Sequence, residues 1–148
     1  MDVLDISLIK LNVTANNKED LLKEISELAF KNGRITDANQ FLADMKKRED
    51  EAPTAFGSLI AIPHGKSHSV KEPFLGFIRP QKSIDWGDEE VKLIFFIGVD
   101  SEGAKKLHLE ILAGISRKLI EDDFRDELLK VNSEDEVLTI LTNALKEK

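Results

Sequence analysis

Apolar residues recur at helical spacing near the start of the chain. A first helix is predicted from its N-cap Asn17 to about Lys31, and Gly33 follows it as a stop. Its apolar face is made by Leu21, Leu22, Ile25, Leu28 and Ala29. Thr36 is predicted to cap a second helix, which ends in the charged run before Pro53.

The middle of the chain has the short apolar runs that are typical of strands. All four prolines lie between residues 53 and 80 of this stretch. Strands are predicted over Leu59–Ile62, Phe74–Ile78 and Val91–Ile97, and the last is apolar enough to be central in a sheet. Leu8–Val13 is either a further strand or an irregular arm.

Helical spacing returns after Val99. Helices are predicted over Ala104–Leu119 and Asp122–Lys130. A last helix opens at Ser133, where Glu136 completes the spacing of a capping box. With no internal repeat and no linker, the order predicts an α/β protein of one domain, residues 1–148, in which helices pack around a central sheet.

Composition narrows the class of function. The chain has 148 residues, 41% of them apolar and 33% charged, and a formal net charge of -7. Because it has no cysteine, disulfides, thiolate catalysis and zinc sites with cysteine ligands are excluded. No basic cluster is present to neutralise phosphates, which argues against direct binding of nucleic acid. No apolar window reaches the length of a membrane span and the start lacks the basic flank of a signal peptide, so we expect a cytoplasmic protein.

The tetrapeptide Ile62-Pro63-His64-Gly65 is the strongest candidate for chemistry. Pro63 has no backbone donor and cannot extend a ladder, and Gly65 permits conformations that other residues avoid. His64 is therefore expected on a loop just past a strand end, where α/β proteins tend to build their sites. From these residues alone, His64 is either a reactive histidine or an ordinary solvated histidine in a turn.

His108 and Arg48 are the next candidates. On a helix, His108 shares a face with Ile111, Leu112 and Ile115, so its ring is expected at the edge of the core. It is either a structural histidine bonded to a backbone carbonyl or part of a site with His64. Arg48 ends a charged helix; it is either a solvated charge or a guanidinium that returns to the strand end carrying His64 and holds an anion there.

Other chemistries are less well supported. His64 and His68 have the spacing of metal ligands on a helix, but Pro63 and Gly65 disfavour a helix there. No elbow motif surrounds Ser58 or Ser67, so neither is expected to be a nucleophile. No cofactor and no metal are expected.

Three segments together make the sequence similar to a known family. They are Arg48 to Gly65 with the Ile-Pro-His-Gly motif, Trp86-Gly87 after a strand, and His108-Leu109-x-x-Leu112. In this order they cover nearly the whole chain. The chain resembles the fructose/mannitol-type (type 2) enzyme IIA domain, EIIA, of the bacterial phosphoenolpyruvate:sugar phosphotransferase system (PTS).

The resemblance implies a fold, a reaction and partners. The family fold is an α/β sandwich whose central mixed sheet is flanked by helices. His64 would accept a phosphoryl group on Nε2 from the histidine phosphocarrier protein (HPr) and pass it to a sugar-specific IIB domain, with Arg48 and His108 as the supporting residues. The chain would then be a phosphotransferase, in contact with the membrane only through its transporter.

The residues before the motif differ from those of many relatives. This chain has Thr54-Ala55-Phe56-Gly57-Ser58 where many relatives have a glycine-rich segment. The segment resembles the corresponding part of EIIA-like domains attached to transcriptional antiterminators and activators. Two functions are therefore expected from the sequence, namely a carrier in sugar uptake or a regulatory module in which phosphorylated His64 changes a protein contact.

Overall fold

The computed structural model describes residues 3–100 and 105–146, with the backbone alone for residues 105–109, 111 and 112. The elements follow in the order β1 (Leu4–Val13), α1 (Lys18–Lys31), α2 (Ala38–Glu51), β2 (Ile60–Ala61), β3 (His64–Lys66), β4 (Phe74–Pro80), β5 (Ile84–Asp85), β6 (Glu90–Val91), β7 (Leu93–Val99), α3 (Lys105–Leu119), α4 (Asp122–Lys130) and α5 (Glu134–Lys146). The predicted helices and the longer predicted strands follow in the expected order, and Leu8–Val13 belongs to a strand rather than to an irregular arm.

A mixed sheet forms the middle of the molecule. Its strands lie in the order β1, β4, β7 and β2, and β3 continues the β2 edge by pairing with β7. β4 and β7 are antiparallel, whereas β1 runs parallel to β4, and β2 and β3 run parallel to β7. The prediction that the apolar run ending near Ile97 is central is confirmed, because β7 has strands on both sides.

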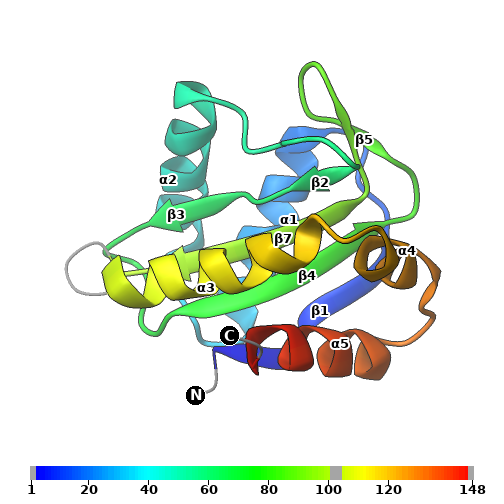
Figure 1. The fold of residues 1–148 in the computed structure, drawn as a ribbon. Coiled ribbons are helices and arrows are strands. Elements are labelled where there is room, and N and C mark those ends of the chain that lie inside the picture. Colours follow the sequence, from blue (N-terminus) through cyan, green and yellow to red (C-terminus); the bar gives the residue numbers. More distant parts are fainter. Residues whose placement is uncertain (1–2, 101–104, 147–148) are drawn as a thin grey trace.

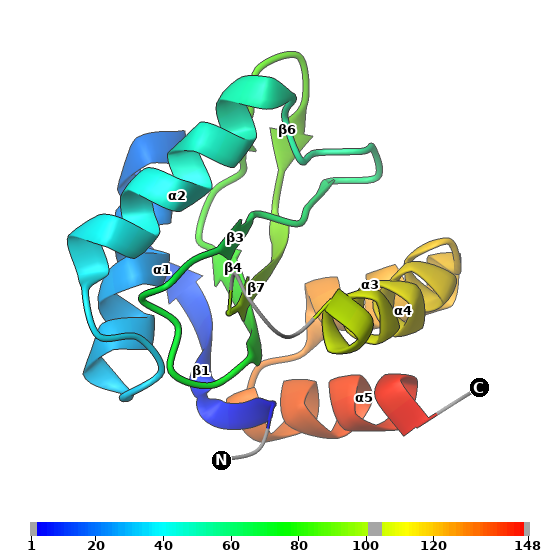
Figure 2. The same ribbon diagram turned by 90° about the vertical axis from the view of Figure 1, so that its left-hand side faces the viewer.

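The sheet separates two layers of helices. Figures 1 and 2 show α1 and α2 on one face and α3, α4 and α5 on the other. Alternation along the strands divides the apolar side chains between the faces. Phe74, Ile94 and Phe96 pack in the cluster of α1 and α2, and Leu75, Phe95 and Ile97 pack in the cluster of the C-terminal helices. The α/β sandwich with a central mixed sheet is therefore confirmed.

Capping residues mark the ends of the helices. The Asn17 side chain accepts a hydrogen bond from the Asp20 backbone N–H at 2.8 Å, as expected for the N-cap of α1. Gly33 follows α1 with φ 73°, the left-handed conformation that suits a glycine after a helix. Ser133 accepts from the Glu136 N–H at 3.2 Å at the start of α5.

One prediction for this half of the chain is wrong, and one element was missed. Thr36 is not the cap of α2: the Asp37 side chain accepts from the Gln40 N–H at 3.0 Å, and the Thr36 hydroxyl donates instead to the Ser69 carbonyl. A short hairpin of β5 and β6 was not predicted. Strands of two residues carry too little periodicity to be recognised from a sequence.

The prediction that His64 lies on a loop is wrong. β2 ends at Ala61, and His64 opens a second short strand, β3, in which it pairs with Ile97 of β7. Pro63 only interrupts the ladder, since its carbonyl still accepts a hydrogen bond from the Ile97 N–H at 3.1 Å. A proline is tolerated here because β2 and β3 form the edge of the sheet.

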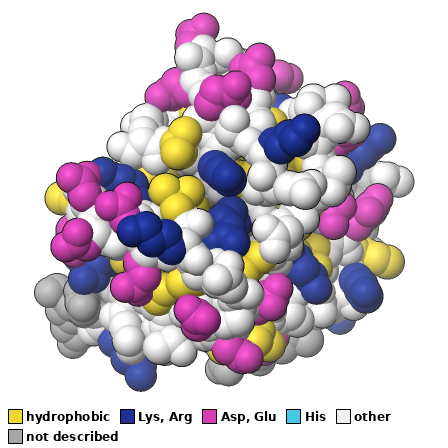
Figure 3. All heavy atoms as spheres, turned by 90° about the vertical axis from the view of Figure 1, so that its right-hand side faces the viewer, with side chains coloured by type: hydrophobic (Ala, Val, Ile, Leu, Met, Phe, Trp, Pro, Cys, Tyr) yellow, Lys and Arg dark blue, Asp and Glu magenta, His cyan; other side chains and the backbone are white. Residues whose placement is uncertain are grey.

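Among the described residues, no helix is both long and apolar enough to span a membrane. Figure 3 shows one outer face of the molecule, on which basic and acidic side chains lie among scattered hydrophobic ones. The net charge of -7 is thus not spread over this face as a single field of one sign.

Close contact between β4 and β7 leads to a prediction about stability. A Cβ atom on Gly98 would overlap the ring of Phe74, the residue opposite it on β4. Because overpacking of a core typically costs about 1–3 kcal/mol, Gly98→Ala should lower the free energy of unfolding by that amount. Denaturant unfolding measures the change.

The matched control is a double-mutant cycle. Phe74→Leu shortens the obstructing side chain, so it should remove part of the cost of Gly98→Ala when the two are combined. A Gly98→Ala protein as stable as the unaltered chain would show that the two strands are not packed this closely.

Candidate functional site

The short strand β3 determines which way the candidate histidine points. A Cβ atom on Gly65 would lie 3.1 Å from the ring of Phe41 on α2, so the position faces α2 and must be small. Alternation then places His64 and Lys66 on the opposite face of the strand. His64 is paired with Ile97, which packs in the cluster of the C-terminal helices. The His64 side chain therefore lies at the sheet edge on the side of α3.

A backbone hydrogen bond selects the tautomer of His64. Its Nδ1 lies 2.9 Å from the carbonyl oxygen of Ile62. A carbonyl oxygen can only accept, so Nδ1 carries the proton and Nε2 carries the lone pair of the neutral ring. Nε2 is thus the nucleophilic nitrogen of this site.

The surroundings favour the neutral ring. Burial of the half-buried His64 side chain is the main cause that holds its pKa below the ordinary value. The positive charges of Arg48 and Lys66 act in the same direction, whereas the Ile62 carbonyl and the Glu49 carboxylate oppose them. At neutral pH the ring is therefore an uncharged nucleophile.

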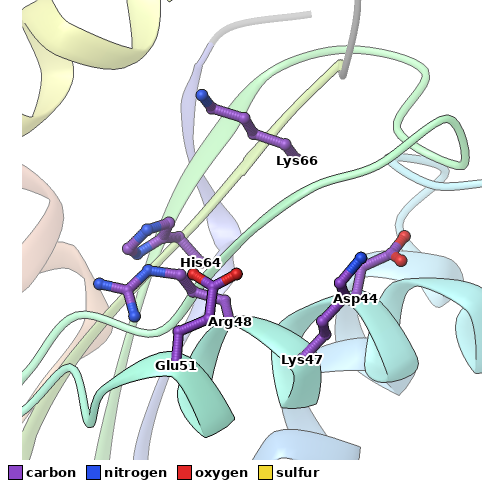
Figure 4. Close-up of a pocket in the computed structure, with 6 residues that line it drawn as sticks. All are labelled: Asp44, Lys47, Arg48, Glu51, His64 and Lys66. Carbon is purple, nitrogen blue, oxygen red and sulfur yellow. The ribbon is translucent and has the colours of Figure 1, made fainter.

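His64 opens into a cavity of about 390 Å³ at the sheet edge. Figure 4 shows its lining, in which α2 contributes four charged side chains and β3 contributes the rest: Asp44, Lys47, Arg48, Glu51, His64 and Lys66. The mixture of cations and carboxylates can attract an anion without holding it tightly. Arg48 is fixed at the end of α2, where its Nη1 donates to the Ala52 carbonyl at 2.8 Å.

The structure brings together some of the predicted site residues. Arg48 and His64 line the same cavity, which supports the reading of Arg48 as a guanidinium that returns to the motif. The helix that carries His108, α3, begins on the face toward which His64 points, but the His108 side chain lies outside the described residues. The relation between the two rings stays a prediction.

The alternatives considered for other residues find no support. His68 and Ser58 are exposed, and Ser67 is buried with its hydroxyl bonded to that of Ser69 at 2.7 Å. His64 begins a strand, which removes the helix on which a His64 and His68 metal pair would depend. Within residues 3–100 and 105–146 no cluster of at least three candidate ligands is present.

Sequence reasoning missed two cations of the cavity. Lys66 is two residues after His64, and period-two alternation would have placed both on one face had β3 been recognised. Lys47 lies in a charged run that is equally typical of a solvated helix face, so the sequence did not single it out.

This arrangement suits transfer of a phosphoryl group. Such transfer mainly requires an in-line nucleophile and positive charge near the phosphoryl oxygens. A neutral imidazole with Nε2 as nucleophile and Arg48 in the same cavity meets both requirements. The fold and site define the chain as a candidate phosphoryl carrier of the α/β sandwich class.

Comparisons with known proteins agree. Residues 2–144 match the family model described as "Phosphoenolpyruvate-dependent sugar phosphotransferase system, EIIA 2". The chain is 37% identical over 148 residues to the "PTS system fructose-like EIIA component" of Escherichia coli (strain K12), covering 98% of this chain and 99% of that relative.

Solved structures show the same fold. The nitrogen regulatory protein IIA-Ntr from Neisseria meningitidis has a TM-score of 0.87 and 30% identity, covering 94% of this chain and 96% of its own. Enzyme IIAMtl in complex with phosphorylated enzyme IIBMtl from Escherichia coli has a TM-score of 0.79 at 23% identity, covering 93% of this chain and 95% of its own, which is a likeness of fold alone.

The chain belongs to the EIIA 2 family of the phosphoenolpyruvate-dependent sugar phosphotransferase system. EIIA components are phosphotransferases that act through a phosphohistidine intermediate. This chain is a phosphoryl carrier of that kind.

The buried ring gives a prediction about pH. Because the pKa of His64 is lowered, its titration midpoint should lie below the value of about 6.5 that is usual for histidine. Nuclear magnetic resonance of ¹⁵N-labelled histidine measures the midpoint and the tautomer together. A midpoint at or above about 6.5, or a neutral ring with its proton on Nε2, would contradict this account of the site.

Proposed function

We propose that His64 accepts a phosphoryl group on Nε2 from HPr and passes it to a sugar-specific IIB domain during sugar uptake. The observation that carries the proposal is the bond from His64 Nδ1 to the Ile62 carbonyl, which leaves the lone pair on Nε2. The family of the chain supports the same reaction. By analogy with the fructose-like relative, the sugar is of the fructose class.

The transfer step balances without a cofactor. The Nε2 lone pair attacks phosphorus, a new P–N bond forms, and the P–N bond to the donor histidine breaks with its electron pair staying on the donor ring. The Nδ1 proton of His64 stays in its hydrogen bond to Ile62, so the phosphorylated ring takes a positive charge. In transfer to IIB, a nucleophile of the IIB domain attacks phosphorus, the P–Nε2 bond breaks, and its electron pair returns to the His64 ring.

Arg48 and His108 are the supporting residues of the proposal. Arg48 offers a permanent charge and several donors to the phosphoryl oxygens from the wall of the cavity. His108, on the first turns of α3, would donate a hydrogen bond or a titratable charge. Neither should grip the phosphoryl group tightly, because onward transfer requires its release.

We also propose that residues 1–148 act as a single EIIA domain in the cytoplasm. The family match runs without a break from residue 2 to residue 144, which supports one domain. Sugar uptake is favoured over the regulatory alternative, because the chain is 37% identical to the fructose-like relative over 98% of its length.

Phosphorylation of the whole protein tests the proposal. With phosphoenolpyruvate, enzyme I and HPr, the intact mass should rise by one acid-labile phosphoryl group. His64→Ala should abolish the gain, and His68→Ala, which changes an exposed histidine outside the cavity, should leave it unchanged. No gain in the unaltered protein, or a full gain in His64→Ala, would refute it.

Arg48→Ala should slow transfer to His64 without unfolding the protein. A hydrogen bond to a charged group contributes about 1.5–3 kcal/mol, so the rate should fall about tenfold to a hundredfold. His108→Ala should also slow transfer. Rapid-quench measurement of phosphoryl transfer from HPr gives the rates, and circular dichroism controls for folding. A variant that transfers at the unaltered rate would limit that residue to a structural role.

A further inference from the structure

Glu49 is a buried carboxylate beside the site that the reaction described above does not use. It follows Arg48 on α2, and the residue is only 6% exposed. Burying a carboxylate is costly unless donors surround it. Glu49 accepts from the Trp86 indole N–H at 3.0 Å and pairs with Lys18 Nζ at 2.7 Å. The ammonium of Lys18 also lies 5.1 Å from the centre of the Trp86 ring.

The same carboxylate holds the segment that leads into β2. Its Oε1 accepts from the Thr54 backbone N–H at 3.1 Å, and its Oε2 accepts from the Thr54 hydroxyl. Glu49 therefore joins α2 to α1, to the β5 and β6 hairpin and to this segment. The two hydrogen bonds to Glu49 orient both the backbone N–H and the hydroxyl of Thr54.

From Thr54 a chain of hydrogen bonds runs to the reactive ring. The Thr54 carbonyl accepts from the Ile62 N–H at 3.2 Å. The carbonyl of the same Ile62 then lies 2.9 Å from His64 Nδ1. The residue that selects the His64 tautomer is thus itself held, through Thr54, by the Glu49 carboxylate.

We propose that Glu49 is a positioning residue for phosphoryl transfer, acting through Thr54 and Ile62 on the orientation and tautomer of His64. The inference rests on His64 being the phosphoryl acceptor. Residues that position a reacting side chain affect the rate, because a displacement of about 1 Å in a reacting group can lower the rate about a hundredfold.

The charge of Glu49 supports the same role. Phosphorylation on Nε2 with the proton kept on Nδ1 makes the ring positive, and a nearby buried carboxylate stabilises that charge. Glu49 is among the groups that raise the pKa of His64, against burial and the charges of Arg48 and Lys66. Glu49 would offset part of the repulsion that the cavity cations exert on the phosphorylated ring.

Two substitutions separate the geometry from the charge. Glu49→Gln keeps the shape and removes the charge, and Thr54→Val removes the hydroxyl bond to Oε2 but leaves the charge and the backbone N–H. The matched control is Asp50→Asn, an exposed carboxylate next to Glu49 on α2 that does not line the cavity.

The first readout is nuclear magnetic resonance of the unphosphorylated full chain labelled at histidine. In Glu49→Gln, the population of His64 with its proton on Nδ1 should fall and the titration midpoint should move further down. Thr54→Val should reduce the same tautomer with less effect on the midpoint, and Asp50→Asn should match the unaltered protein.

The second readout is the rate of transfer from phosphorylated HPr. Glu49→Gln should lower it about tenfold to a hundredfold, and Glu49→Asp, which restores the charge, should recover part of the loss. Unchanged His64 tautomer and midpoint in a folded Glu49→Gln protein would overturn the proposal. If that variant does not fold, an unchanged tautomer in Thr54→Val overturns it and a changed one supports it.

The two proposals fail in different ways. If the unaltered protein takes up no phosphoryl group on His64, the proposed function fails, and the role of Glu49 in phosphoryl transfer fails with it. If the unaltered protein is phosphorylated and Glu49→Gln matches Asp50→Asn in both readouts, only the role of Glu49 fails.

Discussion

Pairing of β3 with the central strand β7 is the constraint on which the site depends. It fixes His64 opposite Ile97 and, through alternation, sends Gly65 toward α2 and the imidazole toward the face of α3. The two residues before His64 complete the arrangement. Pro63 interrupts the ladder, and the Ile62 carbonyl accepts a hydrogen bond from His64 Nδ1. A short edge strand thus supplies a nucleophile whose position and tautomer are both set by backbone geometry.

The charges around the ring fit a carrier better than a binding protein. Lys47, Arg48 and Lys66 can attract a phosphoryl group, while Asp44 and Glu51 line the same cavity and oppose tight binding. A carrier needs this balance because it must accept and release the same group. The lowered pKa of His64 acts in the same sense, since it keeps the ring nucleophilic at neutral pH.

Much of this molecule could be predicted from its sequence. The long helices and β4 and β7 have strong periodicity, and Arg48 and His64 were identified by their place in a family motif. The short strand β3 could not be predicted, because Pro63 and Gly65 read as a loop and only pairing with a distant strand makes the segment extended. Glu49 was overlooked because its partners Lys18, Thr54 and Trp86 come together only in the fold.

Backbone geometry leaves Nε2 of His64 as the nitrogen to which a phosphoryl group would be attached. Long-range ¹H–¹⁵N correlation of the phosphorylated protein identifies the modified nitrogen directly, because the coupling to phosphorus and the ring shifts differ between Nδ1 and Nε2. We expect a single phosphorylated histidine, His64, with phosphorus on Nε2 and the proton on Nδ1. Phosphorus on Nδ1, or on another histidine, would contradict it.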